Sequence, residues 1–323
     1  MRPRISLVVV GRNDNYGGDF LGRLQVSIDV LMSLCGKHEL GIELVLVEWN
    51  PPGDRARLAD AVNWRMTPRG SRVRIIEVPN GVHRKFPRAE EAPLFEYIGK
   101  NVGVRRASGE FVLVTNADIV FAEELIEFMA QTKGSRECFY RVARYDVEGP
   151  IPPELSVEER LAYCERHIRR INGYWGSYDN CLRQKFDPGR ILQHWLDYVR
   201  WRVRYFPCDR PFTNASGDFL MMHQSHWHSL RGYPQIIGAD SHGLFHGDAF
   251  LMYEALFSGL KQVRLRGRKR IYHQEHRRIR NTSLFSRGID EARDRLLGAG
   301  RPVIFNDDLW GLGDYNLPET VIA

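Results

Sequence analysis

The stretch Phe111-Val112-Leu113-Val114-Thr115-Asn116-Ala117-Asp118-Ile119-Val120-Phe121 decides the fold class. It opens with a continuous apolar run, which is typical of a strand buried on both faces. The run ends in the polar residues Asn116-Ala117-Asp118. Ligands of open α/β sheets bind beyond the carboxyl ends of the strands. We therefore expect Asp118 to lie at a ligand site.

Strands and helices alternate on both sides of this stretch. Upstream, the patterns predict strands at Ile5–Val10, Glu43–Val47 and Val73–Val78 and helices at Phe20–Leu34, Asp54–Trp64 and Leu94–Arg106. Downstream, they predict strands at Phe219–Met222, Gln262–Leu265 and Lys269–His273 and helices at Ala122–Gln131, Gln224–Leu230 and Gly247–Ser258. Such alternation predicts an α/β fold with a doubly wound, mostly parallel sheet.

The alternation breaks near Gly149, where three prolines follow within four residues. Two helices are predicted beyond, at Val157–Ile171 and Pro188–Arg204, around an aromatic loop that contains Trp175. This segment is either a plain helical insertion or a lid that stacks an aromatic face on an acceptor sugar. We therefore expect a binding core at 1–148, an insertion at 149–210, the rest of the same domain at 211–285, and an extension at 286–323 that packs on the core.

Composition limits the function classes. The chain has 323 residues, a net charge of +6 and five scattered cysteines without a CxxC pair. No apolar run is long enough to span a bilayer, and no signal peptide is recognisable, so we expect a cytoplasmic protein. The basic residues form short, separated clusters without a nucleic-acid motif, so no nucleic-acid partner is expected. Phosphates of a small donor, or peripheral contact with an acidic membrane, remain open explanations of the charge.

A longer pattern surrounds the opening stretch. Lys100-Asn101-Val102-Gly103 is followed by Ala107-Ser108-Gly109-Glu110, the apolar strand and Asn116-Ala117-Asp118. This order resembles the family 2 type of GT-A glycosyltransferases, in which an Arg/Lys-Asn pair and a Gly-Glu turn precede Asp-x-Asp. The resemblance implies a GT-A fold and transfer of a sugar from a UDP- or GDP-sugar to the hydroxyl of a glycan, lipid-linked or small acceptor.

The resemblance also implies donor-binding positions and one departure from the family pattern. The donor would contact residues at the ends of the first two strands and around the motif: Gly11, Asn13, Glu48, Lys100, Asn101, Asn116 and Asp118. Asn116 stands where the family has its first acid, so Asp118 is the only acidic ligand that the motif offers.

Glycosyl transfer needs a group that stabilises the leaving diphosphate, and a divalent cation such as Mn²⁺ or Mg²⁺ commonly does this. By resemblance, His273 or His276 in the motif Tyr272–His276 would complete the ligands around Asp118. Asp248, in His246-Gly247-Asp248, is the candidate base that takes the acceptor proton, with Asp218 and Asp240 as alternatives. Trp175, Asp218 and His246 are the predicted acceptor-side residues. Direct displacement would invert the anomeric centre.

Other readings of these residues remain open. Each acid could also cap or complement the start of a helix, and a His–x–x–His pair is often structural. His223, His226 and His228 lack a fourth zinc ligand. The loop after Val10 has no Gly-x-Gly-x-x-Gly, which disfavours a dehydrogenase. Because Asn116 removes a charge, the main alternative is a catalytically silent GT-A domain that binds a nucleotide, glycan or partner.

Overall fold

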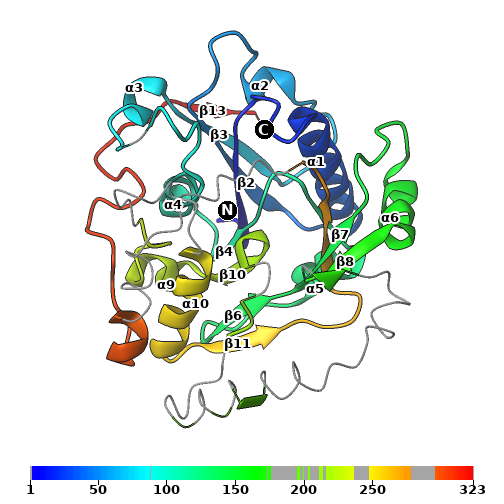
Figure 1. The fold of residues 1–323 in the computed structure, drawn as a ribbon. Helices are drawn as coiled ribbons and strands as arrows, with labels where there is room; N and C mark the ends of the chain where they lie inside the picture. Colours follow the sequence, from blue (N-terminus) through cyan, green and yellow to red (C-terminus); the bar gives the residue numbers. More distant parts are fainter. Residues whose placement is uncertain are drawn as a thin grey trace.

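The computed structural model describes residues 2–87, 89–172, 174–175, 195–196, 199, 203, 211–213, 216–235, 247–277 and 295–322. Within this part of the chain, the main sheet has eight strands (Figure 1). Their spatial order is β11 (Lys261–Arg264), β6 (Cys138–Arg141), β10 (Leu220–His223), β4 (Phe111–Val114), β1 (Ile5–Gly11), β2 (Ile42–Trp49), β3 (Arg72–Val78) and β13 (Glu319–Val321).

The middle of this sheet is parallel, as the sequence predicts. Strands β4, β1, β2 and β3 pair in parallel, and β11 pairs in parallel with β6. Strand β10 runs antiparallel to β4 and β6, and β13 runs antiparallel to β3. The carboxyl ends of β1 to β4 therefore meet at one edge, where a ligand is expected.

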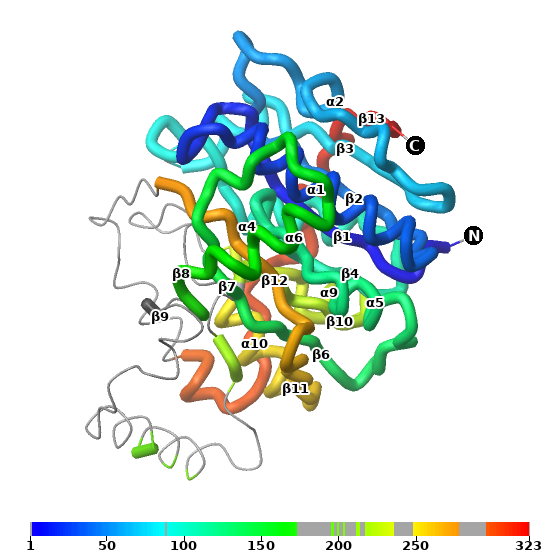
Figure 2. The backbone as a smooth tube through the Cα atoms, turned by 90° about the vertical axis from the view of Figure 1, so that its right-hand side faces the viewer, coloured from blue at the N-terminus to red at the C-terminus, as the bar shows by residue number. Residues whose placement is uncertain are grey.

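Helices cover both faces of the sheet, which explains why its central strands are apolar throughout. On one face, Leu7 and Leu44 pack with α1 (Phe20–Lys37), α5 (Glu123–Gln131) and α6 (Val157–Arg166). On the other face, Val8 and Val45 pack with α4 (Glu96–Arg106), α9 (Gln224–Ser229) and α10 (Gly247–Phe257). Figure 2 shows α1 and α6 close together on the first face. Side chains alternate between the faces because successive strand residues point in opposite directions.

A second sheet adjoins the first and was not expected from the sequence. Its described strands are β5 (Ile119–Phe121), β12 (Arg270–Gln274), β7 (Ala143–Val147), β8 (Ile168–Ile171) and β9 (Tyr174–Trp175), in that spatial order. Strand β12 is antiparallel to β5 and parallel to β7, and β8 is antiparallel to both β7 and β9. The short turn between β4 and β5 carries the chain from one sheet to the other.

Two predicted helices are wrong in extent. The helix predicted over Asp54–Trp64 is a single turn, α2 (Leu58–Ala61), because Arg57 and Val62 are both extended. The helix predicted over Val157–Ile171 ends at Arg166, and its last four residues form β8 instead. Pairing of Ile168–Ile171 with β7 supplies backbone hydrogen bonds that outweigh the local helical spacing. The predicted helix at Pro188–Arg204 lies almost entirely outside the described residues.

The C-terminal stretch packs back on the body. Trp310 and Leu312 are buried in the same core cluster as α4, and β13 completes the edge of the sheet next to β3. The guanidinium of Arg106 donates to the carbonyls of Gly311 and Leu312, at 2.7 Å each. Of the helices in the described ranges, none is long and apolar enough to cross a membrane.

Candidate cation and donor site

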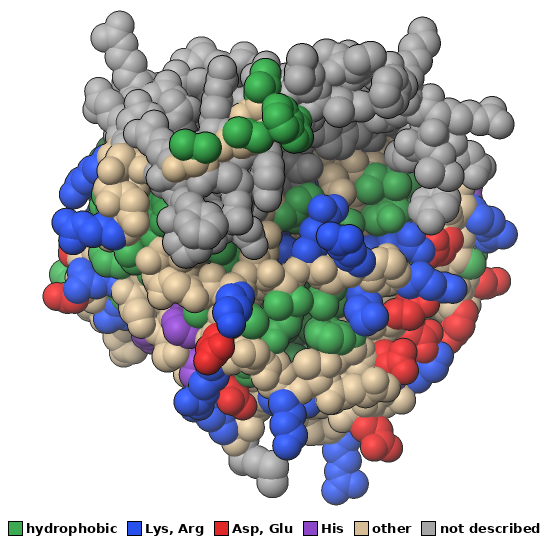
Figure 3. All heavy atoms as spheres, turned by 90° about the horizontal axis from the view of Figure 1, so that it is seen from below, with side chains coloured by type: hydrophobic (Ala, Val, Ile, Leu, Met, Phe, Trp, Pro, Cys, Tyr) green, Lys and Arg blue, Asp and Glu red, His purple; other side chains and the backbone are tan. Residues whose placement is uncertain are grey.

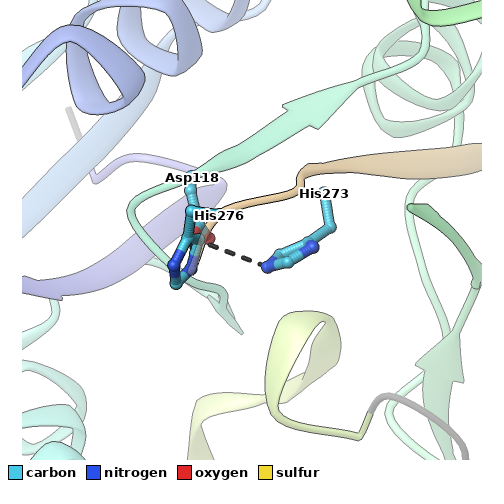
Figure 4. A group of neighbouring side chains, drawn as sticks. All are labelled: Asp118, His273 and His276. Carbon is cyan, nitrogen blue, oxygen red and sulfur yellow. Dashed lines mark ion pairs between the residues drawn. The ribbon is translucent and has the colours of Figure 1, made fainter. Parts of the chain in front are cut away.

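Three predicted ligands meet where the two sheets adjoin. Asp118 lies in the turn between β4 and β5, while His273 and His276 lie at and just beyond the end of β12. His276 Nε2 is 3.0 Å and His273 Nε2 is 3.6 Å from Asp118 Oδ2. One potential ligand atom from each residue lies within 4.8 Å of the others. In Figure 4, the His273 ring points from its strand toward Asp118, and His276 lies beside the carboxylate.

Strand pairing explains why residues so distant in sequence meet. Strand β12 pairs with β5 in a register that places His273 opposite Ile119, the residue after Asp118. The backbone N–H of Gln274 donates to the Asp118 carbonyl at 3.2 Å. The Gln274 side chain is fully buried and donates to the Ser27 hydroxyl of α1 at 3.0 Å. Strand β12 is therefore fixed to the turn and to the covering helix.

The charges in this group favour an ionised carboxylate. Burial alone would raise the pKa of Asp118, but His273, His276 and Arg23 hold it well below its ordinary value. Burial would lower the pKa of His273, yet Asp118 and Asp146 raise it. A negative carboxylate beside two imidazoles is a donor set that a divalent cation can share.

The β1–α1 loop closes one side of this group. Gly17 has a φ of +68°, and a Cβ at this position would collide with the His276 ring and lie 3.0 Å from the Arg277 carbonyl. The Tyr16 ring meets that of His276 edge to face, with ring centroids 5.3 Å apart. Arg23 of α1 donates to the Tyr16 carbonyl at 2.6 Å. A residue without a side chain is therefore needed where the loop touches His276.

Asn116 holds Asp218 rather than lying unpaired. Its amide Nδ2 donates to Asp218 Oδ1 at 2.7 Å, and Arg144 donates to Asp218 Oδ2 at 2.6 Å. The Thr115 hydroxyl donates to the Asp218 carbonyl at 2.7 Å. The structure thus places Asn116, the residue that differs from the family motif, beside Asp218, the predicted acceptor-side acid. The two roles predicted for these residues, in donor and acceptor binding, remain predictions.

Asp248 lies at the first turn of α10, and only 6% of the residue is exposed. Its Oδ1 accepts from the backbone N–H of Ala249 at 2.8 Å. The other oxygen, Oδ2, lies 3.2 Å from where a Cβ on Gly217 would be, so Asp248 adjoins the short helix η1 (Ser216–Asp218). Burial and the neighbouring Asp248, to which the phenol is hydrogen-bonded, raise the pKa of Tyr97.

Lys100 and Asn101 are fully buried on α4 and hold the acceptor-side backbone. The Lys100 ammonium donates to the Gly217 carbonyl at 3.0 Å and to Glu96 at 2.5 Å. The Asn101 amide donates to the Tyr233 carbonyl and accepts from its N–H, at 2.8 and 2.7 Å. In this arrangement both side chains position other residues, and their direct contact with a donor remains a prediction.

An open cleft of about 610 Å³ lies at the carboxyl ends of β1, β2 and β3. The lining consists mainly of residues that follow these strands, with one acid from the end of β3 itself. They are Arg12, Asn50, Pro51, Pro52, Gly53, Arg57, Glu77, Pro79, Asn80, Gly81 and Arg84. The Asn80 amide donates to the Asn50 side-chain oxygen at 2.9 Å. This is the edge at which the family resemblance places the donor.

The predicted residues at the ends of the first two strands do not line this cleft but adjoin residues that do: Gly11 and Asn13 flank Arg12, and Glu48 binds the residue after Arg57. Gly11 contacts Phe20, and the Asn13 amide donates to the Ala56 carbonyl at 3.0 Å. Glu48 is only 1% exposed, and its carboxylate accepts from the Leu58 N–H at 3.0 Å, where α2 begins. Burial raises the pKa of Glu48 to about 7. Its predicted donor contact is not tested by this geometry.

The described residues do not include every predicted site residue. His246 and Asp240 lie outside the described residues, and for Trp175 only the backbone, in β9, is described. In contrast, three charged residues that the sequence analysis did not name lie beside the cation group. Asp146 Oδ1 is 3.0 Å from His273 Nδ1, and Arg144 and Arg170 flank the same carboxylate at 3.1 and 3.3 Å. The missed signal was the alternation in Ala143-Arg144-Tyr145-Asp146-Val147, a period-two strand pattern.

Solved structures of similar fold identify the fold class of this chain. The chain superposes on the UDP complex of S. aureus TarS 1-349 with a TM-score of 0.51 and 13% sequence identity, over 95% of this chain and 67% of that one. The chain has the GT-A fold. TarS 1-349 itself gives a TM-score of 0.49 at 12% identity, over 84% of this chain and 60% of that chain. The UDP-GlcNAc complex gives 0.48 at 13% identity, over 95% and 68%. No protein-family model matches the chain, and no curated protein matches its sequence.

Proposed function

We propose that this GT-A chain is a glycosyltransferase that uses a nucleoside-diphosphate sugar and a divalent cation. The observation that carries the proposal is the convergence of Asp118, His273 and His276 at the carboxyl edge of the sheet. The β1–α1 loop links this group to the cleft, because Arg12 lines the cleft and Gly17 touches His276. The TarS structure of similar fold is a UDP complex, which makes UDP the first nucleotide to test.

The donor set favours one cation over the other. Mg²⁺ prefers oxygen ligands and retains several waters, whereas imidazole nitrogens suit softer divalent ions. Two imidazoles with one carboxylate therefore fit Mn²⁺ better than Mg²⁺. When bound, such a cation would neutralise charge that develops on the leaving diphosphate. Asp118, His273 and His276 would hold it.

The remaining steps fall to side chains of the chain itself. We assign the nucleobase to the cleft, where Asn80 and Arg84 offer polar contacts. Asp248 would take the proton of the acceptor hydroxyl as its oxygen attacks the anomeric carbon and the bond to the diphosphate breaks. Direct displacement of this kind inverts the anomeric centre. Lys100 and Asn101 would keep η1 and the Tyr233 segment in place around that reaction.

The acceptor-binding segment and the cellular compartment are part of the same proposal. We propose that residues 149–210 contribute to acceptor binding, and that the protein works in a reducing, cytoplasmic compartment. Cys35, Cys138 and Cys164 are free thiols in the described part of the chain, as such a compartment allows. On the face shown in Figure 3, Lys and Arg side chains are interrupted by acidic and apolar ones. Among the described residues of this face, that distribution lends no support to a continuous nucleic-acid or membrane surface.

Metal-linked nucleotide binding tests the proposal. We expect UDP or GDP to raise the melting temperature of the wild-type protein strongly with Mn²⁺ and weakly with EDTA, because ligands that bind only the folded state stabilise it. Asp118→Asn should remove the Mn²⁺-dependent part of the shift and lower transfer from a nucleotide sugar at least ~100-fold. Glu137→Gln, a change at a 79% exposed side chain, is the control and should alter neither. Unchanged transfer in EDTA would contradict the proposal.

A catalytically silent GT-A domain is the second candidate, and the Asn116 position favours it. Since the Asn116 amide is engaged with Asp218, the motif offers one acidic side chain, Asp118, to a cation. This candidate predicts nucleotide binding without hydrolysis or transfer. A screen of UDP- and GDP-sugars for released nucleotide, with and without acceptors, separates the two.

A further inference from the structure

Asp146 is a buried carboxylate that the proposed reaction does not use. It is 0% exposed, and it lies on the side of His273 opposite to Asp118. The distance from Asp146 Oδ1 to His273 Nδ1 is 3.0 Å, whereas the other ring nitrogen, Nε2, points to Asp118 at 3.6 Å. The His273 imidazole therefore lies between two carboxylates, that of Asp118 and that of Asp146.

The strand register places these residues on one face of the second sheet. In the parallel pairing of β12 and β7, His273 is the direct partner of Asp146. Arg144 lies two residues before Asp146, on the same face, and Arg170 is the partner of Asp146 on β8. The intervening Tyr145 and Tyr272 belong to the opposite face, where their rings meet at 6.2 Å.

Two arginines flank the carboxylate, one beside the oxygen that faces the imidazole and one beside the other oxygen. Arg144 Nε is 3.1 Å from Asp146 Oδ1, and Arg170 Nε is 3.3 Å from Oδ2. Each arginine also has a second acid, Asp218 for Arg144 and Glu275 for Arg170. Asp146 consequently has little freedom to rotate away from His273.

We propose that Asp146 is a positioning residue for the cation site: its carboxylate, 3.0 Å from Nδ1 of His273, would accept a hydrogen bond from the Nδ1 proton in the cation-bound protein and so direct the Nε2 lone pair toward the cation held with Asp118. Ligating histidines generally donate their second ring nitrogen to a carboxylate or carbonyl, which fixes the tautomer and the ring orientation. The inference rests on the proposed cation site at Asp118, His273 and His276. In this proposal, the pairing of β7 and β12 in the second sheet helps to hold His273 in place as a ligand.

The test measures Mn²⁺ affinity directly, by electron paramagnetic resonance of the free ion, without substrate or turnover. We expect Asp146→Asn to weaken Mn²⁺ binding 10- to 100-fold, the usual effect of losing such a partner. The asparagine keeps the size of the side chain and removes its charge, while Arg144 and Arg170 keep their second partners, Asp218 and Glu275. Glu165→Gln is the matched control, since Glu165 is paired with Arg270 of the same β12 strand but has no contact with His273. It should bind Mn²⁺ like the wild type.

A measurement on the wild-type protein keeps the inference testable if Asp146→Asn does not fold. In the Zn²⁺-loaded protein, ¹H–¹⁵N spectra should show the ring proton of His273 on Nδ1, with the His273→Gln spectrum identifying the signal. A proton on Nε2 would overturn the inference. Equal Mn²⁺ affinity of wild type and a folded Asp146→Asn variant would overturn it while leaving the cation site intact. Absence of Mn²⁺ binding by the wild type would sink the cation site together with it.

Discussion

At the residue scale, the departure at Asn116 has a structural explanation. Its amide donates to Asp218 Oδ1, and Arg144 occupies the other oxygen. An amide can donate a hydrogen bond where a carboxylate would only accept, so asparagine suits a position that faces a buried acid. The sequence alone showed a missing charge, because the partner lies 102 residues away along the chain.

Restoring the family motif is therefore expected to harm the protein. Asn116→Asp would place two carboxylates where a 2.7 Å hydrogen bond now lies, with one oxygen of Asp218 left unpaired. We expect a loss of about 2 kcal/mol in the free energy of unfolding and at least tenfold lower transfer at neutral pH. Asn116→Ser, which adds no charge, is the comparison and should be less affected. Higher activity in Asn116→Asp would show that the position is a cation ligand lost from the motif.

The sequence predicted Asp118, His273 and His276 as ligands of one cation, and the structure brings their side chains together. That they bind a cation remains a prediction. Asp146 was missed, because a charged residue is ordinarily read as exposed. Only tertiary pairing with His273 and two arginines makes its burial tolerable.

At the scale of elements, long apolar strands and helices were predictable and short paired strands were not. The central strands β1 to β4 and helix α1 follow from their hydrophobic patterns. The second sheet was missed because its strands, of two to five residues, depend on partners far away in the chain. Strand β8 shows the effect most clearly, since its local spacing is helical and its pairing with β7 prevails.

The C-terminal segment gives a prediction at this scale. Trp310 is 4% exposed, and its ring packs beside Arg105 at 5.3 Å and His228 at 5.5 Å. Because a buried tryptophan leaves a large cavity when truncated, Trp310→Ala should lower the free energy of unfolding by about 3–5 kcal/mol. The neighbouring Leu309 is 54% exposed, so Leu309→Ala should change it by no more than about 0.5 kcal/mol. Urea unfolding followed by fluorescence measures both, and equal effects would refute docking of this segment through Trp310.

At the scale of the whole molecule, one buried acid near the cleft links global stability to pH. Glu48 is 1% exposed, and burial raises its pKa from 4.5 to about 7 in the folded protein. Between these two values the folded state retains a proton that the unfolded state releases. The contribution of Glu48 to stability is therefore complete below pH 4.5 and declines as the pH rises through 7.

Glu48→Gln should remove this dependence. We expect the stability of the variant relative to the wild type to increase from pH 5 to pH 7, by up to about 1.4 kcal/mol per pH unit, and to level off above pH 7. Denaturant unfolding at a series of pH values measures the difference. Glu137→Gln, at a 79% exposed side chain, is a control for general effects of charge. A difference that does not vary with pH would show that Glu48 is ionised throughout.

The group formed by Asp118, His273 and His276 also bears on how the chain is held together. Asp118 and Gln274, the neighbour of His273, are 156 residues apart in the chain, yet they are joined by hydrogen bonds at the junction of the two sheets. An ion bound there would act as a removable cross-link between distant segments. Since its ligands converge only in the folded chain, the ion would stabilise the folded state, in which the two sheets are joined, and would not stabilise the unfolded chain. Opening of the second sheet away from the first would then become rarer as the concentration of the ion rises. The same ion would therefore affect both donor binding and the association of the two sheets.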